Sequence, residues 1–385
     1  MRLEMRSSLA RHVMVQIAAL LWLGGAEAAP PAGTPVFIQV QGLAPTSVGL
    51  NGFIVAGDFT EGGAFHWMPA SGVTLIGGES GNVSRDGRTI VGRLADANGN
   101  DQPAIWTGGT SWRLLGPLIP NALPCQSTLG FATAASGDER FVVGGGYYGT
   151  SVTDACAGGS FSAFRWDESS GYVLLGEPGR ASRADAISAD GRVIVGYQAG
   201  TITAVEGVKW VDGRKEAIAG PLGLPVGYAR AVNRDGTLIA GTSCVPDVEP
   251  GRGPTAWAWT SADGIKCYPV VEIPPWVPWV DRRNPLYNVY IYAVSDDGRV
   301  MGGDIEFDVA AGDEEAVIWF DGEPVFLRDY LRDHGYPDAF KDHFNTGRIT
   351  AVSPDGRTIV GHNGGVFGAV NRNGFIVILP ELVKK

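Results

Sequence analysis

The sequence lacks the short motifs by which many catalytic sites are recognised. It contains no His-Glu-x-x-His, no Gly-x-Ser-x-Gly, no phosphate-binding glycine-rich loop followed by a helix, and no Cys-x-x-Cys. Histidine is scarce as well, with five residues in 385. These absences leave no recognisable catalytic set, and no cofactor is expected.

Basic side chains are fewer than acidic ones. The chain has 30 Lys and Arg against 41 Asp and Glu, a net charge of −11. Nucleic-acid binding depends on basic surface, so this balance argues against a nucleic-acid partner. It equally disfavours docking on anionic membranes or polyanionic sugars, and mainly favours solubility.

Long apolar runs are absent except near the N-terminus. There, Arg2, Arg6 and Arg11 precede an apolar run at 13–23 and the small-x-small sequence at 26–28. This order is typical of a secretory signal, and the run is short for a membrane span. We expect residues 1–28 to be a signal peptide, with no membrane insertion. The remaining domain, 29–385, would be exported to the periplasm or the extracellular medium.

Seven copies of one short pattern occupy the rest of the chain. Each copy has a small-residue strand, an Asp-Gly-type turn and an apolar strand ending in Gly, and most continue with a strand written Ala-x-x-Trp. The seven strand-ending glycines, spaced 35 to 62 residues apart, are Gly57, Gly92, Gly144, Gly196, Gly241, Gly303 and Gly361. Asp-Gly between apolar runs predicts a hairpin, because Gly adopts positive φ without strain.

Four strands per unit at this period predict an all-β, seven-bladed β-propeller with four antiparallel strands per blade. The seventh copy is one strand short at the C-terminus. A strand at about 36–43 precedes the first copy, and we expect it to complete blade seven and close the ring. In an alternative register, residues 367–371 complete that blade.

The repeat also resembles a known family. The motif Ala-x-Ser-x-Asp-Gly-Arg-x-Ile-Val-Gly at 186–196 and 351–361, with Ala-Phe-Arg-Trp at 163–166, is similar to that of HAF-type extracellular repeat proteins of bacteria. The resemblance covers nearly the whole domain. It implies export and a propeller-like fold, and it implies no activity or catalytic residue.

Four cysteines in an exported chain predict two disulfides. Of the three possible pairings we favour Cys125–Cys156 and Cys244–Cys267, because each pair falls within one blade and towards one face. The alternative is that one pair stays reduced.

The variable insertions fall in the connections from second to third strand and from fourth strand to the next blade. Both open on one face, where functional residues are expected. The segment 272–292 on that face is rich in aromatic residues, and Trp276, Trp279 and Tyr287 are candidates for a ligand-binding platform. The alternative is that they pack this long loop against its own blade.

Two further groups on the same face are weaker candidates. Asp304, Glu306 and Asp308 alternate near a strand end and could supply oxygen ligands to Ca²⁺, although EF-hand spacing is absent and a solvated acidic loop is the alternative. His334 and His343 precede blade seven, and His362 ends a strand in it. A general base or metal site could form if they share a rim.

The sequence therefore favours a monomeric binding or interaction module. Its ligand, a glycan or an envelope protein, would lie on the insertion-bearing face. The alternative is an extracytoplasmic polysaccharide lyase or hydrolase with its site at the channel mouth, supported only by the three histidines and nearby carboxylates.

Overall fold

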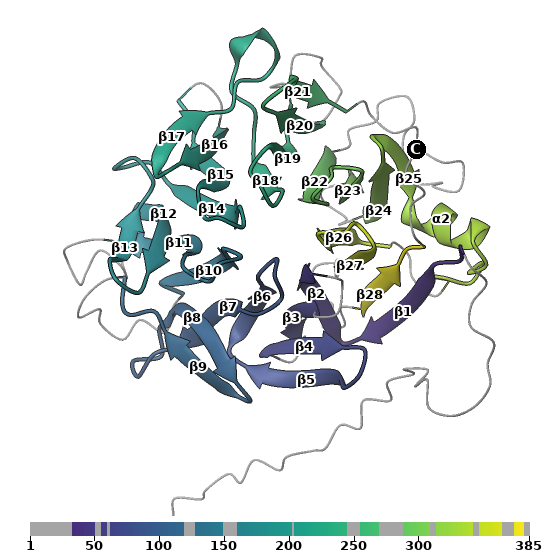
Figure 1. Cartoon of the computed structure of the whole chain (residues 1–385), viewed down its shortest axis with the longest axis horizontal. Helices are drawn as coiled ribbons and strands as arrows, with labels where there is room; N and C mark the ends of the chain where they lie inside the picture. The colour runs from purple at the N-terminus through teal and green to yellow at the C-terminus, as the bar shows by residue number, and fades with distance from the viewer. Residues whose placement is uncertain are drawn as a thin grey trace, which may run out of the picture.

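The seven predicted sheets are present and stand side by side around one axis, each with four antiparallel strands (Figure 1). The structure is a computed structural model that describes residues 33–50, 55–59, 62–118, 128–148, 160–201, 204–244, 255–268, 288–308, 313–341, 346–363 and 373–380. The first strand of each blade lies nearest the centre of the ring and the fourth lies at the outer rim.

The strands of the first four blades follow the chain in order. Blade 1 contains β2 (Leu43–Val48), β3 (Val55–Phe59), β4 (Ala64–Met68) and β5 (Gly72–Gly77). Blade 2 contains β6 (Glu79–Val83), β7 (Ile90–Ala95), β8 (Asp101–Gly108) and β9 (Ser111–Leu114). Blade 3 contains β10 (Gly130–Ala135), β11 (Val142–Tyr148), β12 (Ser160–Asp167) and β13 (Gly171–Leu174). Blade 4 contains β14 (Ser182–Ile187), β15 (Val193–Ala199), β16 (Val205–Val211) and β17 (Arg214–Ala217).

The last three blades include the only helices of the described residues. Blade 5 follows the short 3₁₀ helix η2 (Pro221–Gly223) and contains β18 (Ala229–Val232), β19 (Leu238–Thr242), β20 (Ala256–Thr260) and β21 (Gly264–Cys267). Blade 6 contains β22 (Asn288–Val294), β23 (Val300–Asp308), β24 (Asp313–Phe320) and β25 (Glu323–Phe326), and helix α2 (Leu327–Asp333) follows it. Blade 7 contains β26 (Arg348–Val352), β27 (Thr358–His362), β28 (Asn373–Ile378) and β1 (Val36–Gln41).

The ring closes as predicted, with the N-terminal strand in the last blade. β1 pairs antiparallel with β28 from Val36 opposite Ile378 to Gln41 opposite Asn373. It ends at Gln41, two residues earlier than the predicted 36–43, because Gly42 has φ +72 and turns the chain into β2. β1 supplies the fourth strand, so blade seven does not require residues 367–371, which lie outside the described residues.

The Ser-x-Asp-Gly turns are built by a small set of side-chain hydrogen bonds. In blade 4 the buried Ser188 hydroxyl donates to Asp190 at 2.6 Å and accepts from the Val193 amide at 3.0 Å. Gly191 has φ +75, a conformation that Gly adopts at little cost. Satisfying the backbone in this way fixes the register of the hairpin, and equivalent bonds recur in blades 2, 3, 6 and 7.

The hydrophobic core is divided among the junctions between neighbouring blades. Each of the seven junctions has its own cluster of buried side chains. The repeated Trp fills this space: Trp210 and Trp319 are fully buried, and Trp67 and Trp166 nearly so. Large aromatic residues at one strand position thus account for sheet-on-sheet packing around the ring.

Helix α2 covers the outer part of the junction between blades 6 and 7. Its buried Leu327 and Leu331 join the cluster that contains Phe375 of β28. Phe340, in the segment after the helix, packs edge-on against Phe37 of β1 at 5.1 Å. The segment after the helix therefore contacts the strand that closes the ring.

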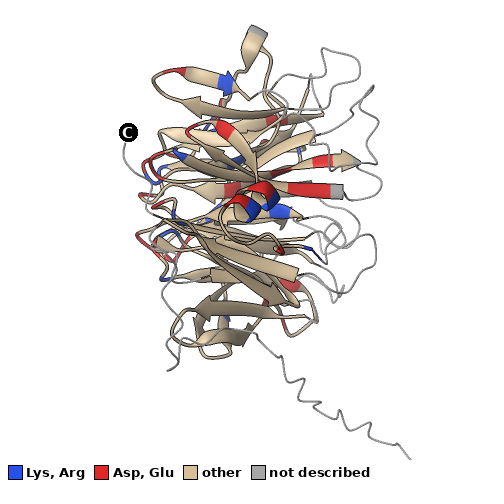
Figure 2. Cartoon of the chain, turned by 90° about the vertical axis from the view of Figure 1, so that its right-hand side faces the viewer, with Lys and Arg blue, Asp and Glu red and all other residues tan. Residues whose placement is uncertain are grey.

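The two sides of the ring differ in the connections they carry. We call the side with the Ser-x-Asp-Gly turns and the short third-to-fourth connections the turn face, and the opposite side the insertion face. On the insertion face β21 ends at Cys267 and β22 begins only at Asn288. Edge-on, charged turns gather on the left-hand side of the view and acidic strand ends lie on the right-hand side (Figure 2).

Candidate functional site

At the turn-face end of the centre, the inner turns of neighbouring blades bond directly to one another. The Asp138 amide donates to Ala189 O at 3.3 Å, and the Ala189 amide donates to Arg234 O at 2.8 Å. The Arg234 amide donates to the Asp296 carboxylate at 3.0 Å, and the Asp296 amide donates to Pro354 O at 2.8 Å. These bonds draw the turns of blades 3 to 7 together.

One side chain crosses this end from the opposite side of the ring. Arg85, in the turn of blade 2, donates to Val232 O of blade 5 at 3.1 Å and forms an ion pair with Asp296 of blade 6. Blade 2 faces blades 5 and 6 across the ring (Figure 1). The guanidinium therefore occupies the turn-face end of the centre.

Towards the insertion face, every inner strand carries a bulge at the same place. The register with the second strand shifts there in all seven blades. In chain order, the residue at this position is Thr46, Gly81, Thr133, Asp185, Arg230, Tyr292 and Thr350.

In three blades the bulge residue is a threonine with one structural task. Its hydroxyl donates to a backbone carbonyl of the next blade, which joins the two inner strands. These bonds run from Thr46 to Gly81 at 2.8 Å, from Thr133 to Ala184 at 2.8 Å and from Thr350 to Pro45 at 2.7 Å. A small hydroxyl is thus sufficient to join neighbouring blades at this level.

Blades 4 and 5 instead present a network of charged and aromatic side chains. Asp185 accepts from Arg183 at 2.5 Å and from Arg230 at 2.9 Å. The Arg230 guanidinium lies 4.3 Å from the ring centre of Tyr228 and 6.0 Å from that of Tyr197. The two tyrosine rings meet edge-to-face at 4.9 Å. A cation held between two aromatic faces and a carboxylate is a favourable arrangement.

Blades 6 and 7 continue this network along the ring. Tyr290 and Tyr292 of β22 stack in parallel at 5.7 Å, and the Arg348 guanidinium lies 5.7 Å from the Tyr292 ring centre. Arg348 makes a two-point ion pair with Glu314 and reaches within 3.8 Å of Asp304. We call the half-buried side chains of blades 4 to 7 the inner belt: Arg183, Asp185, Tyr197, Tyr228, Arg230, Tyr290, Tyr292 and Arg348.

Burial sets the protonation of this region. The pKa of Asp304 is raised well above its usual range by burial and by the carboxylates of Glu314 and Glu306, which together outweigh Arg348. Burial also raises the pKa of Tyr292. Burial alone would lower the pKa of Arg348, but Asp304 and its other neighbours raise it further, so this guanidinium stays charged.

The predicted histidines lie on different elements. His334 follows α2 at the outer rim, where its ring stacks on Tyr330 at 4.2 Å and its Nδ1 lies 2.7 Å from Tyr330 O. His362 ends β27, the second strand of blade 7, with Nδ1 3.2 Å from Asn363 O. His343 lies outside the described residues.

The acidic residues predicted as calcium ligands lie in strands, so their interpretation as a solvated acidic loop is wrong. Asp304 and Glu306 belong to β23, and Asp304 is 1% exposed. The strand continues because Ile305 and Phe307 alternate with these carboxylates and fill the core between blades 5 and 6. The side chain of Asp308 lies outside the described residues, as does the predicted platform of Trp276, Trp279 and Tyr287.

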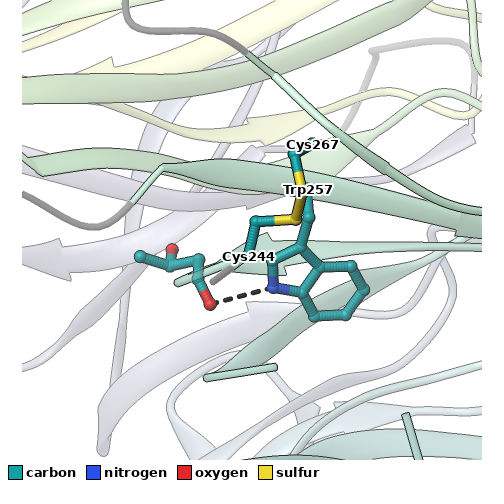
Figure 3. The surroundings of a disulfide bond; sticks show 4 residues. Cys244, Trp257 and Cys267 are labelled. Atoms are coloured by element: carbon teal, nitrogen blue, oxygen red, sulfur yellow. Dashed lines mark hydrogen bonds between the residues drawn. A yellow bond between two sulfur atoms is a disulfide. The ribbon is translucent and has the colours of Figure 1, made fainter. Parts of the chain in front are cut away.

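The Cys244–Cys267 disulfide is present as predicted. It joins Cys244, two residues after the end of β19, to Cys267 at the end of β21. The Cα–Cα distance is 5.6 Å (Figure 3). Trp257 lies beside it and donates from Nε1 to Thr242 O at 2.9 Å. Cys125 and Cys156 lie outside the described residues, so their pairing stays a prediction.

Two kinds of feature are absent from the described residues. No group of three or more His, Cys, Asp or Glu residues is arranged to hold a metal ion. No described helix has the length and apolar character needed to cross a membrane.

Sequence reasoning missed the inner belt, although its signal is present. The repeat pattern shows the inner strands only as strands of small residues. Aligned on the turns, the residue eight before the turn glycine or its equivalent is Ala44, Glu79, Phe131, Arg183, Tyr228, Tyr290 and Arg348. A position that changes from blade to blade within a uniform repeat indicates a task other than packing.

Comparison with known proteins adds architecture only. No family model matches the chain, and no curated protein matches its sequence. Among solved structures, it is similar to TolB from Acinetobacter baumannii, with 9% identity, 76% of this chain and 62% of that chain covered, and a TM-score of 0.42. It is also similar to the β-propeller domain of the Trilobed protease from Pyrococcus furiosus, with 12% identity, 84% of this chain and 91% of that chain covered, and a TM-score of 0.47. At these scores the likeness does not extend to function.

Proposed function

We propose that this chain is an exported binding module whose ligand lies at the insertion-face end of the ring centre, against the inner belt. The observation that carries this proposal is the replacement of the bulge threonine in blades 4 to 6. Thr46, Thr133 and Thr350 show that a hydroxyl joins neighbouring blades at this level. A hydroxyl is therefore sufficient to join neighbouring blades. Asp185 and Arg230 also pair between blades 4 and 5, but they and Tyr292 are larger and more polar than this task requires.

The chemistry of the belt supports a binding role. Tyrosine and arginine are enriched where proteins bind partners, because each combines a large contact area with polar groups. The belt residues are half-buried, held by ion pairs and ring contacts, and so lose little freedom on binding. Arg85 occupies the opposite end of the centre, which favours approach from the insertion face.

Export is the second part of the proposal. The Cys244–Cys267 disulfide is typical of proteins that fold in oxidising compartments. The N-terminal pattern of residues 1–28 and the resemblance to HAF-type repeats support the same compartment. The ligand classes available there are glycans and envelope proteins, and the sequence predicts that the aromatic segment 272–292 lies on the same face.

The test is a ligand search with position-matched variants. The mature protein is applied to a glycan array and to cross-linking pull-down from an envelope extract. A variant with Tyr197→Leu and Tyr228→Leu removes two aromatic faces of the belt, and Arg88→Met on the exposed turn face is the control. The proposal expects a ligand that binds the control and the wild type equally and the belt variant at least tenfold more weakly.

Two outcomes would contradict it. One is a ligand whose affinity is unchanged by the belt substitutions in a variant whose thermal unfolding shows it to be folded. The other is the absence of any ligand on either the array or the extract.

A further inference from the structure

The two halves of the inner belt have the same parts but different charge. On blades 4 and 5, two tyrosines and one carboxylate surround a cation that the protein supplies, the guanidinium of Arg230. On blades 6 and 7, two tyrosines lie beside two carboxylates of β23, and the protein's own cation, Arg348, lies 5.7 Å from the Tyr292 ring centre and is paired with Glu314. We call Tyr290, Tyr292, Asp304 and Glu306 the tyrosine–carboxylate corner.

No described cation fully balances this corner. The nearest is Arg348, which is held by two bonds from its guanidinium to Glu314 and stays 3.8 Å from Asp304. Glu306 accepts hydrogen bonds from the Tyr290 hydroxyl at 3.1 Å and the Asn288 amide at 3.3 Å, both neutral donors. Its carboxylate therefore has no ion-pair partner among the described residues.

Asp304 is a second carboxyl group whose charge the described residues balance only in part. It is 1% exposed, and no hydrogen bond of ordinary geometry from the described residues reaches either of its carboxylate oxygens. Its partners are Arg348 at 3.8 Å and the Tyr292 side chain, which favour the ionised form but are outweighed by burial and the neighbouring glutamates. Buried carboxyl groups are costly unless they are paired, so native proteins rarely leave one in this state. It lies opposite Tyr290 in the register of β22 and β23.

We propose that the tyrosine–carboxylate corner binds an organic cation, an ammonium group carried by the ligand. The cation would contact the tyrosine rings and Glu306, as the Arg230 guanidinium contacts the rings of Tyr197 and Tyr228 and the carboxylate of Asp185. The ring pairs themselves differ, since they meet edge-to-face on blades 4 and 5 and lie parallel on blade 6. This inference deepens the proposed function and depends on it. An ammonium group on a sugar and one on a peptide side chain share this chemistry.

Protonation of Asp304 links this site to pH. The groups that face Asp304 are Arg348, Glu314, Glu306 and Tyr292, and burial with the two glutamates raises its pKa. A bound cation favours the ionised carboxyl, so binding releases a proton while Asp304 is protonated. Cation affinity should therefore rise with pH through this range, and Asp304→Asn should remove that dependence.

The experiment compares charged probes with neutral partners of similar shape. Glucosamine is titrated against N-acetylglucosamine, and Nα-acetyl-lysine amide against its Nε-acetylated form, by calorimetry on the mature protein. The expected result is saturable binding of at least one charged probe, tenfold or more tighter than its neutral partner. The tighter of the two charged probes identifies a sugar or a peptide source.

Matched variants assign the effect to the corner. Glu306→Gln keeps the shape of the side chain and should reduce the charged-probe affinity at least tenfold, whereas Glu168→Gln on an exposed turn should not. Tyr290→Phe should cause a smaller loss, since it keeps the ring and removes one bond to Glu306. The thermal unfolding midpoint of each variant shows whether it is folded.

The inference is overturned if neither charged probe binds, if charged and neutral probes bind equally, or if Glu306→Gln binds as the wild type does. The proposed function fails separately. A ligand from the array or extract that responds to Tyr197→Leu and Tyr228→Leu, but not to Glu306→Gln, leaves the function standing and removes only the cation.

Discussion

The two ends of the ring centre are formed by the same seven inner strands, yet they end in different chemistry. At the turn face, successive turns bond to one another and Arg85 reaches across to blades 5 and 6. At the insertion face, half-buried tyrosines, arginines and carboxylates lie side by side on blades 4 to 7. At the turn face, the polar groups bond to other groups of the protein. At the insertion face, some of the polar and aromatic side chains stay accessible to a ligand.

This difference teaches that stability and function can be separated along the axis of a single repeat. Turn-face substitutions should lower stability and leave binding intact. Substitutions in the inner belt should do the reverse. The predictions below test that separation, beginning with the largest change in the free energy of unfolding.

The disulfide sharpens the comparison, since it stabilises the insertion side at the outer strand of blade 5. Replacing both Cys244 and Cys267 by Ala should lower the free energy of unfolding by about 3 kcal/mol, because the bond restricts the unfolded chain over 23 residues. Urea denaturation with the wild type under reducing and oxidising conditions gives the matched control. Ligand affinity should persist below the unfolding midpoint, and equal stability of variant and wild type would refute the bond.

Arg85 tests the turn-face end directly. Arg85→Met keeps the length of the side chain but removes its bond to Val232 O and its ion pair with Asp296, at a cost of about 2 kcal/mol. Arg88→Met in the same turn is the control, because that side chain is 77% exposed and should change stability by less than about 0.5 kcal/mol. Equal unfolding midpoints for the two variants would show that the crossing contact does not stabilise the ring.

Asp304 makes the insertion-face end sensitive to pH. Its folded pKa is raised, so the folded state binds this proton more tightly than the unfolded state does. The free energy of unfolding should fall as pH rises from the ordinary aspartate range, near 4, through the raised pKa, by at most about 1.4 kcal/mol per pH unit. Asp304→Asn should flatten part of this slope in denaturation series, leaving the contribution of Glu315, whose pKa burial also raises. An unchanged slope would mean that Asp304 is ionised in the folded state.

The bulge threonines should have the smallest effect. Thr350→Val removes a donor to Pro45 O while keeping the shape, and we expect a loss of about 1 kcal/mol measured by denaturation. Tyr292→Phe at the equivalent position of blade 6 should cost less, because its hydroxyl interacts with Asp304 of its own blade and, among the described residues, makes no bond to a carbonyl of the next blade. A larger loss for Tyr292→Phe would assign the belt a structural task and break the comparison.

The repeat could be read from the sequence because it depends on local chemistry. Gly191, Ser188 and the apolar strand after them determine a hairpin within a few residues, and each Trp fills the same inter-blade space. Ring closure could be predicted by counting strands. The seventh unit lacks one strand, and the strand before the first unit, β1, completes it. The end of β1 was two residues off because Gly42 turns the chain early.

The site was harder to predict because it depends on contacts between blades. Arg85 and Asp296 are 211 residues apart, and only the closed ring brings them together. Asp304 was recognised as part of an acidic pattern, but its burial follows from the packing of blade 7 against β23, which the strand itself does not reveal. A sequence with alternating carboxylates is equally typical of a solvated strand end, so the pattern alone could not distinguish the two.

The central claim, that ligand binding resides at the inner belt, is tested most directly by one affinity ratio. For a ligand identified from the array or the extract, the dissociation constant of the Tyr197→Leu, Tyr228→Leu variant is divided by that of Arg85→Met. A ratio of ten or more, with Arg85→Met binding as tightly as the wild type despite its lower stability, is the predicted result. A ratio near one would contradict the account. The insertion-face end of the ring centre would then contribute no more to binding than the turn-face end.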